Sequence, residues 1–393
     1  MGVLHLINII AHALDEGKFC LGIFLDLSKA FDTIDHRILL SKLQFYGIRG
    51  ISLDWFRSYL QNRMQYVVVN GVKSLSTHIH CGVPQGSVLG PILFLVYIND
   101  IINATSYFSY SLFADDTSLL ASDKDVCSLI STANDEINKL YMWFCCNKLL
   151  LNIQKTQYVI FRTRGKRIPT NAPPLIIGGL QAARSENVLF LGVTMNEFMS
   201  WKQHIYNVCT RVSRSIGAMS KLRFSVPKDV LTTLYNSIIM PHLTYCNVAW
   251  GNTYSSHVHK LQILQKRAIR LITNSHYRSP SVPLFLQLNC LPFNELVSLS
   301  ALSFMYKLHM STSPSLFKDL FVRNSDVHSH NTRQKSLIHQ PNVATNIALN
   351  SFYIFCIKEW NLLPTGIKGS TTFSRFKVMT HKYLFQRLTQ SDG

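Results

Sequence analysis

Three aspartates stand where apolar segments of the chain end. Asp26 follows the apolar run of residues 21–25, and Asp115 and Asp116 lie between two apolar segments. An unpaired carboxylate beside buried apolar residues costs free energy unless a cation or a hydrogen-bond donor meets it. Two adjacent carboxylates also repel each other, and a bound Mg²⁺ ion removes that repulsion. Together the three aspartates predict a shared site for a divalent metal ion.

Each aspartate also has an ordinary structural interpretation. Aspartate is common in tight turns, so the Asp115-Asp116 pair alone would favour a simple hairpin turn. Asp26 alone could cap a helix or pair with a nearby lysine. The Gly/Pro-rich residues 82–91 lie between the aspartates in the sequence. Glycines there would allow close approach of a ligand, and the helix expected after them offers free N–H groups.

The segments around these residues predict an α+β fold with a mostly antiparallel sheet and helices packed on one face. The apolar run that ends at Asp26 is typical of a strand buried on both faces. The spacing of apolar residues predicts an amphipathic helix at 123–146, and Asn70-Gly71 predicts a hairpin with a type I′ turn. Strands are expected around 107–121 and at 156–161 and 188–195, and helices at 123–146, 201–222, 228–239, 256–273 and 293–309.

The positive charge of the chain is concentrated in its second half. The formal net charge is +18, but residues 1–195 carry 17 Lys+Arg against 14 Asp+Glu, which leaves 22 basic and 7 acidic residues in 196–393. Phosphate backbones are the expected partner of such a surface, because neutralising phosphates releases bound counterions. An anionic membrane is the competing partner, but no apolar run reaches the roughly 18 residues of a spanning helix.

Four basic residues fall together on one predicted helix of this half, and we expect them to contact nucleic acid: Lys260, Lys266, Arg267 and Arg270. A solvated helix face is the ordinary meaning of such a pattern. The nine cysteines include no C-x-x-C pair, so we expect free thiols and no zinc site. The N-terminus lacks the pattern of a signal peptide, which predicts an intracellular protein without resolving nucleus from cytoplasm.

Several segments, in this order, resemble the reverse transcriptases of LINE-type (non-LTR) retrotransposons. Residues 25–32 (LDLSKAFD) are similar to polymerase motif A, residues 82–91 (GVPQGSVLGP) to motif B, and residues 113–116 (FADD) to motif C. Residues 149–156 resemble motif D, and residues 190–193 (FLGV) resemble the motif E region that contacts the primer. The resemblance is strong over residues 1–200 and much less specific beyond them.

The resemblance implies a reverse transcriptase that uses two Mg²⁺ ions, with Mn²⁺ as a possible substitute, for nucleotidyl transfer to a primer 3′-hydroxyl. Asp26 and Asp115 would hold the ions, Asp116 would support them, and Lys155 would lie near the triphosphate. A solvated surface lysine and a core phenylalanine remain the alternatives for Lys155 and Phe31. The implied partners are an RNA template, a DNA primer and deoxynucleoside triphosphates, contacted by Phe31, Pro84, Gln85, Gly86, Phe113 and Ala114.

The resemblance also divides the chain into four expected parts. These are a palm with partial fingers at 1–195, a helical thumb-like region at 196–320, a polar linker or loop at 321–346 and a small helical segment at 347–393. Fingers motifs that precede motif A in the family are not found, so we expect an N-terminally truncated element. The alternative function is a non-catalytic, nucleic-acid-binding remnant of such an element.

Overall fold

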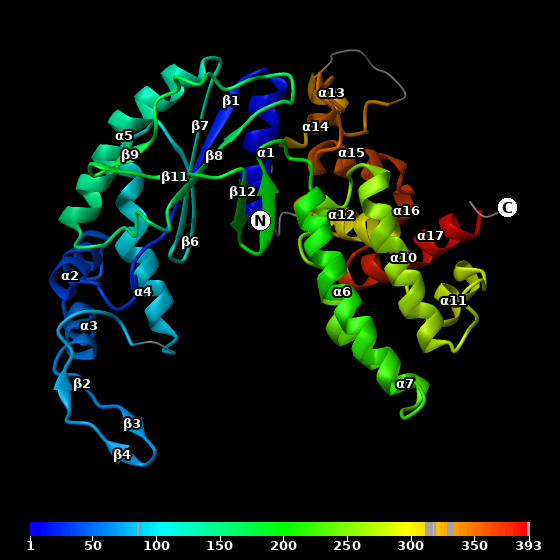
Figure 1. The fold of residues 1–393 in the computed structure, drawn as a ribbon, viewed down its shortest axis with the longest axis horizontal. Helices are drawn as coiled ribbons and strands as arrows, with labels where there is room; N and C mark the ends of the chain where they lie inside the picture. The colour runs from blue at the N-terminus through cyan, green and yellow to red at the C-terminus, as the bar shows by residue number, and fades with distance from the viewer. Residues whose placement is uncertain (85, 311–316, 318–319, 328–333, 391–393) are drawn as a thin grey trace. The chain divides into compact units, whose positions relative to one another are not determined.

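The computed structural model describes residues 1–84, 86–310, 317, 320–327 and 334–390 of the chain (Figure 1). Contacts divide the chain into two compact units. The sheet unit comprises Gly2 and Gly17–Val188, and the helical unit comprises Met1, Val3–Glu16 and Leu189–Gly393. The chain is therefore a mixture of helix and strand, and most of its first helix groups with the second half of the sequence.

A five-stranded sheet forms the centre of the sheet unit. Its strands, in spatial order, are β11 (Ala183–Arg184), β8 (Gln157–Phe161), β1 (Phe19–Leu25), β7 (Asp116–Asp123) and β6 (Ser109–Phe113). Neighbouring strands run antiparallel, except that β11 runs parallel to β8. The sheet is thus antiparallel over four strands, with one short parallel strand at its edge.

Strand β1 lies in the middle of this sheet because its side chains are apolar on both faces. Leu21 and Ile23 are fully buried on one face, and Cys20 is fully buried on the other. A Cβ atom on Gly22 would lie 2.9 Å from the ring of Phe161, so glycine lets the aromatic ring of β8 pack against β1. The prediction of a strand buried on both faces is confirmed.

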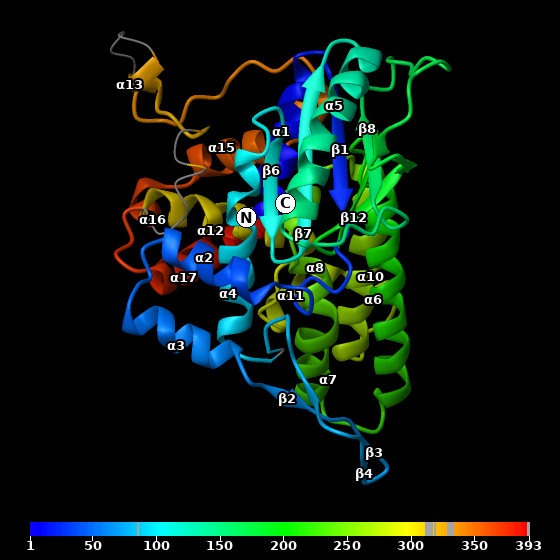
Figure 2. The ribbon, with the colours of Figure 1, turned by 90° about the vertical axis from the view of Figure 1, so that its left-hand side faces the viewer.

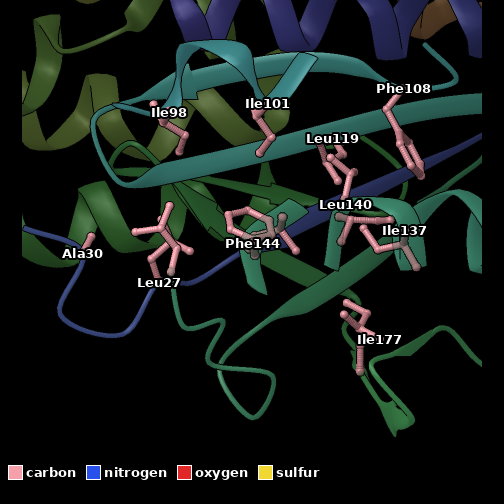
Figure 3. Packing of buried hydrophobic residues seen from close by; sticks show 14 of the residues in the cluster. Leu27, Ala30, Ile98, Ile101, Phe108, Leu119, Ile137, Leu140, Phe144 and Ile177 are labelled. Atoms are coloured by element: carbon pink, nitrogen blue, oxygen red, sulfur yellow. The ribbon is translucent and has the colours of Figure 1, made fainter. Parts of the chain in front are cut away.

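Helices share one hydrophobic cluster with the face of the sheet to which Leu21 and Ile23 contribute. They are α2 (His36–Phe45), α3 (Ile51–Leu60), α4 (Leu89–Ile98), the 3₁₀ turn η1 (Asn99–Asn103) and α5 (Val126–Cys146). Ile137, Leu140 and Phe144 of α5 lie in one cluster with Leu119 of β7 and Ile101 of η1 (Figure 3). Each fully buried side chain of this kind contributes about 1.5–3 kcal/mol, so this cluster supports the sheet.

Within the sheet unit, a long hairpin projects from the end of α3 (Figures 1 and 2). Its ladders pair β2 (Met64–Gln65) with β5 (Thr77–His78) and β3 (Val68–Val69) with β4 (Val72–Lys73). Asn70 and Gly71 connect β3 to β4 with φ angles of 51° and 81°. Both angles are positive, as the type I′ turn requires, so the predicted hairpin is confirmed.

Two further hairpins follow α5, namely β9 (Ile176–Ile177) with β10 (Leu180–Gln181) and β12 (Asn187–Phe190) with β13 (Val193–Asn196). The prediction of one strand over 188–195 was wrong, because the chain reverses at Leu191 and Gly192. Both residues have positive φ angles, 44° and 77°. Leucine rarely adopts this conformation, so local sequence preference did not indicate the turn.

The helical unit contains α1 (Gly2–Asp15) and helices from residue 202 onward. These are α6 (Lys202–Leu222), α7 (Lys228–Leu234), the π-helical turn η2 (Tyr235–Ile239), α8 (Met240–Thr244), α9 (Asn247–Trp250), α10 (Ser255–Ile272), α11 (Ser281–Gln287), α12 (Phe293–His309), α13 (Asn324–Val327), α14 (Asn346–Leu349), α15 (Phe352–Leu362), α16 (Thr365–Lys368) and α17 (Phe373–Gln390). The four long helices predicted for this half are confirmed, with 228–239 divided between α7 and η2.

Two polar contacts tie distant parts of the helical unit together. The Oδ1 atom of Asp15, at the end of α1, accepts hydrogen bonds from the backbone N–H groups of Ala344 and Thr345. In α17, Arg387 binds Glu295 of α12 at 2.6 Å and Glu359 of α15 at 3.0 Å. Such a paired arrangement offsets the cost of holding charges in a partly buried place.

The four-part division expected from the sequence remains a prediction. The structure places the boundary between its two units at Val188 and Leu189, inside β12. Within 321–346, the described residues form α13 and a bridge between Arg323 and Ile338. In the described parts of the chain, every helix is too short or too polar to cross a membrane.

Candidate functional site

The pairing of the central strands brings the three aspartates to one end of the sheet. Strands β1 and β7 run antiparallel with Leu25 opposite Thr117. Asp26, the residue after β1, therefore lies at the same end as Asp115 and Asp116, where β7 begins. Residues almost 90 positions apart in the sequence thus meet because a central strand ends where its neighbour starts.

The turn between β6 and β7 presents two carboxylates to solvent. Phe113 pairs with Asp116, which leaves only Ala114 and Asp115 to reverse the chain. Ala114 takes a φ angle of +51°, a left-handed conformation that is strained for alanine. Asp115 and Asp116 are exposed, and Phe113 is also exposed. The predicted tight turn with the Asp pair is present.

The carboxylates are close enough to influence one another. Loss of hydration raises the pKa of Asp116, and the negative charges of Asp115 and Asp26 raise that pKa further. Among the described residues, no ion pair involves any of the three. The end of the sheet therefore gathers negative charge that lacks a neighbouring cation from the described part of the protein.

These residues fit a divalent cation by chemistry and charge. Carboxylate oxygens are the ligands that Mg²⁺ prefers. In the described parts of the chain, however, no three His, Cys, Asp or Glu side chains are arranged so that they could hold a metal ion as they stand. Carboxylates that repel one another do not close into a ready-made set of ligands, so closure would require rotation of the exposed side chains.

A loop after α5 fixes the backbone of Asp26. The N–H of Asn152 donates to the Asp26 carbonyl at 2.8 Å, and the Asp26 N–H donates to the hydroxyl of Thr156 at 3.3 Å. Thr156 is fully buried, and its hydroxyl donates in turn to the Asn152 carbonyl. Lys155 lies in this loop with its side chain exposed. The loop thus adjoins the first aspartate through its backbone.

The segment after Asp26 is bound to the Gly/Pro-rich segment. The N–H of Gly82 donates to the Ile34 carbonyl at 2.8 Å, and the N–H of Val83 donates to the Phe31 carbonyl at 2.9 Å. His36 Nε2 donates to the Gly82 carbonyl at 2.7 Å. The ring of Phe31 is half-buried, with its centroid 4.9 Å from that of Phe94. Phe31 is therefore at least a packing residue.

The Gly/Pro-rich segment then turns into α4 through a serine. Ser87 donates its hydroxyl to the Pro84 carbonyl at 2.7 Å and accepts from the Gly90 N–H at 3.0 Å. Pro84 is half-buried and Gly86 is exposed with a φ angle of +79°. Gln85 lies outside the described residues. The sequence reasoning gave Ser87 no role, although a serine just before the start of a helix is a capping signal.

The four basic residues predicted to contact nucleic acid are all on α10, but they differ in exposure and in hydrogen bonding. Lys260 and Arg267 are exposed, whereas Lys266 and Arg270 are half-buried. Arg270 donates from both Nε and Nη2 to the Ser279 carbonyl, at 3.0 and 2.9 Å. Its guanidinium therefore holds a loop of the helical unit, and its contact with nucleic acid stays a prediction.

A tyrosine that the sequence reasoning left without a role supports the turn between β12 and β13. The hydroxyl of Tyr245 donates to the Leu191 carbonyl at 2.7 Å. A Cβ atom on Gly192 would lie 3.3 Å from the Tyr245 ring. The residues that resemble motif E are thus held by a side chain more than fifty positions later. No local sequence signal indicates such a contact.

Comparison with known proteins places this arrangement in context. Residues 3–195 match the family model described as "Reverse transcriptase (RNA-dependent DNA polymerase)". A relative named "RNA-directed DNA polymerase from mobile element jockey", from Drosophila melanogaster, is 28% identical over 281 residues, which cover 68% of this chain and 30% of the relative. A relative named "Probable RNA-directed DNA polymerase from transposon BS", from the same organism, is 27% identical over 310 residues, which cover 74% of this chain and 33% of the relative.

The solved structures include a telomerase from Candida albicans in complex with a telomeric RNA fragment. It matches at 11% identity with a TM-score of 0.42, over 80% of this chain and 50% of that one. The chain spans about a third of the length of the curated relatives it matches.

Proposed function

Residues 3–195 are a reverse transcriptase domain of the kind found in non-LTR retrotransposons, and from this we propose that the chain acts as an RNA-directed DNA polymerase. The observation that carries the proposal is the meeting of Asp26, Asp115 and Asp116 at one end of the sheet, where lost hydration and then the charges of Asp115 and Asp26 raise the pKa of Asp116. The proposed substrates are an RNA template, a DNA primer and deoxynucleoside triphosphates. The palm-like architecture of residues 1–195 belongs to the same proposal.

Reverse transcriptases use divalent metal ions. We assign two Mg²⁺ ions, replaceable by Mn²⁺, to Asp26 and Asp115, with Asp116 supporting them. When bound, such ions activate the primer 3′-hydroxyl and stabilise the leaving pyrophosphate. The exposed turn that carries Asp115 and Asp116 lets both side chains rotate toward the ions, whereas Asp26 is held by its own backbone bonds to Asn152 and Thr156.

Substrate contacts are proposed for residues beside these carboxylates, namely Phe31, Pro84, Gln85, Gly86, Phe113 and Ala114. Two backbone hydrogen bonds keep Phe31 next to the Gly/Pro-rich segment, which supports a joint role in placing the incoming nucleotide. Lys155 is exposed, close in sequence to the two residues that bind the Asp26 backbone. We propose that its ammonium group faces the triphosphate.

Primer extension on an RNA template, with Mg²⁺ or Mn²⁺, tests the proposal. Asp115→Asn keeps the size of the side chain and removes a metal ligand, so we expect extension to fall at least about 100-fold, as for loss of a group that stabilises developing charge. Asp135→Asn is the matched control, because Asp135 is an exposed aspartate on α5 of the same unit. Full activity of Asp115→Asn would refute the assignment.

A different outcome would favour the alternative function. If the unmodified chain extends no primer but binds RNA, it is a nucleic-acid-binding remnant of a retrotransposon protein. Binding by the basic helical unit should then weaken steeply with salt, because each neutralised phosphate releases counterions. The exposed Lys260 and Arg267, with Lys266, are the proposed contacts.

A further inference from the structure

The end of α3 and the hairpin that follows it carry a row of aromatic and cationic side chains. We name as the aromatic strip Trp55, Tyr59, Arg63, Tyr66 and Lys73. Trp55 and Tyr59 are four residues apart on α3 and so share one of its faces, and Arg63 follows shortly after α3 ends at Leu60. The whole of residues 61–78 is exposed. The strip therefore offers its rings and charges to solvent.

The rings of the strip are already arranged for stacking. Trp55 and Tyr59 have centroids 5.6 Å apart and planes inclined by only 9°. Trp55 is 54% exposed, whereas Tyr59 is half-buried against the core, which anchors the pair. A third ring, that of Tyr66, is 51% exposed on the hairpin. An exposed tryptophan held parallel to an anchored ring is a platform on which a further flat group can stack.

A cation lies beside each of the two tyrosine rings. The Arg63 guanidinium lies 5.4 Å from the centroid of Tyr59, and its Nη1 donates to the Tyr59 carbonyl. The Lys73 ammonium lies 5.0 Å from the centroid of Tyr66. Each cation is thus positioned by a ring and keeps N–H groups available for another partner.

The charge of this region is one-sided. Residues 49–80 contain four Lys or Arg side chains and one carboxylate, Asp54. Asp54 is bound to Arg57 within α3. Arg63 and Lys73 therefore face solvent, and neither forms an ion pair with a carboxylate of the described residues. A polyanion complements the charge of this surface, and a polyanion that also carries planar aromatic groups complements the rings as well.

We propose that the aromatic strip binds single-stranded nucleic acid, with a base stacked on Trp55 and phosphates contacted by Arg63 and Lys73. Stacked bases and cations that follow the backbone are how proteins hold single strands without reading their sequence. A duplex hides the faces of its bases, so it would not gain the stacking. The site adds to the proposed polymerase, and binding needs neither nucleotides nor metal ions.

The experiment uses the full chain and fluorescein-labelled oligo(U) and oligo(dT) of 12 nucleotides, without divalent cations. Trp55→Ala is expected to weaken binding about tenfold, within the range measured for removing one stacking side chain. Trp55→Phe should keep most of the affinity, because a ring remains. Phe45→Ala is the matched control, because Phe45 is an aromatic residue of the same unit that is 85% exposed.

Intrinsic fluorescence locates the bound strand. All five tryptophans lie in the described residues; Trp55 is exposed, Trp143 is half-buried and the other three are buried. Quenching of the emission by oligonucleotide should therefore be large in the unmodified chain and nearly absent in Trp55→Phe. Arg63→Gln should lower the slope of log affinity against log salt by about 0.7, as expected for one phosphate contact on a single strand.

Two results would overturn the proposal. One is equal affinity of Trp55→Ala and Phe45→Ala together with unquenched tryptophan emission in the unmodified chain. The other is a change of sedimentation coefficient in Trp55→Ala without a change in binding, which would make the strip a contact between copies of the chain. Because primer extension is not the readout, failure here is distinct from failure of the proposed catalytic centre.

Discussion

Replacing Gly82 by alanine should separate the Gly/Pro-rich segment from residues 31–34, the segment that follows Asp26. A Cβ atom at this position would lie 2.8 Å from the Asp32 carbonyl oxygen and 2.9 Å from its Cα atom. These are backbone atoms, which cannot rotate aside as the tip of a side chain can. The segment 31–34 must therefore move away, and the hydrogen bonds of Gly82 to Ile34 and of Val83 to Phe31 would lengthen or break.

Gly71→Ala is a matched control for this change. Gly71 has a φ angle of 81°, close to the 86° of Gly82, and nothing lies within 4 Å of its Cβ position. Both variants incur the left-handed strain of about 1–2 kcal/mol. Gly82→Ala should lose about 1–3 kcal/mol more, from two hydrogen bonds of about 0.5–1.5 kcal/mol each.

Urea unfolding gives the difference between these two variants, and hydrogen exchange shows where it arises. We expect faster exchange of the amides of Gly82 and Val83 only in Gly82→Ala. We also expect primer extension to fall more in Gly82→Ala, because Phe31 moves with its segment. Equal free energies of unfolding for the two variants, with unchanged exchange at these amides, would show that the contact with Asp32 does not hold the segments together.

Four other substitutions test further parts of the structure. Because the pKa of Asp116 is raised in the folded chain, its ionisation lowers stability as the pH rises through that pKa. Without divalent cations, Asp116→Asn should therefore melt at a higher temperature than the unmodified chain when the pH is above this pKa, and at the same temperature when the pH is below it. Asp26→Asn should lower the pKa of Asp116, which carboxyl NMR would measure. Tyr245→Phe loses the bond to the Leu191 carbonyl, so unfolding should cost about 0.5–1.5 kcal/mol less, with faster amide exchange in that turn. Arg387→Met leaves two partly buried glutamates unpaired and should destabilise toward the lower end of about 3–5 kcal/mol, because Arg387 is 31% exposed; unchanged urea midpoints would contradict the last two expectations.

The elements that could be predicted from the sequence are those whose cause is local. The apolar run of β1, the periodic face of α5 and the Asn70-Gly71 turn each carry their signal within a few residues, and each is confirmed. The meeting of Asp26 with the Asp pair needed only that two expected strands be neighbours. A continuous apolar run, a period of 3.6 and a turn dipeptide are all visible directly in the sequence.

What could not be predicted has its cause far away in the chain. Leu191 reverses the chain in a left-handed conformation because Tyr245 binds its carbonyl and Gly192 follows. The loop of Asn152 and Thr156 is ordered by its bonds to Asp26. Arg270 looked like a surface charge, yet it holds the Ser279 carbonyl. Each of these depends on a tertiary contact, which overrides local preference.

The bond between Asp15 and residues 344–345 sets an order of events during synthesis. Helix α1 leaves the ribosome well before residues 344–345, because the backbone groups that its Asp15 carboxylate binds are made 329 or more residues later. At about 5–20 residues per second, that interval is roughly 15–65 seconds. Residues 17–188 are complete well before then and can fold meanwhile, whereas the Asp15 carboxylate must wait for its backbone donors. The bond between the end of α1 and residues 344–345 is thus among the late contacts to form as the chain folds.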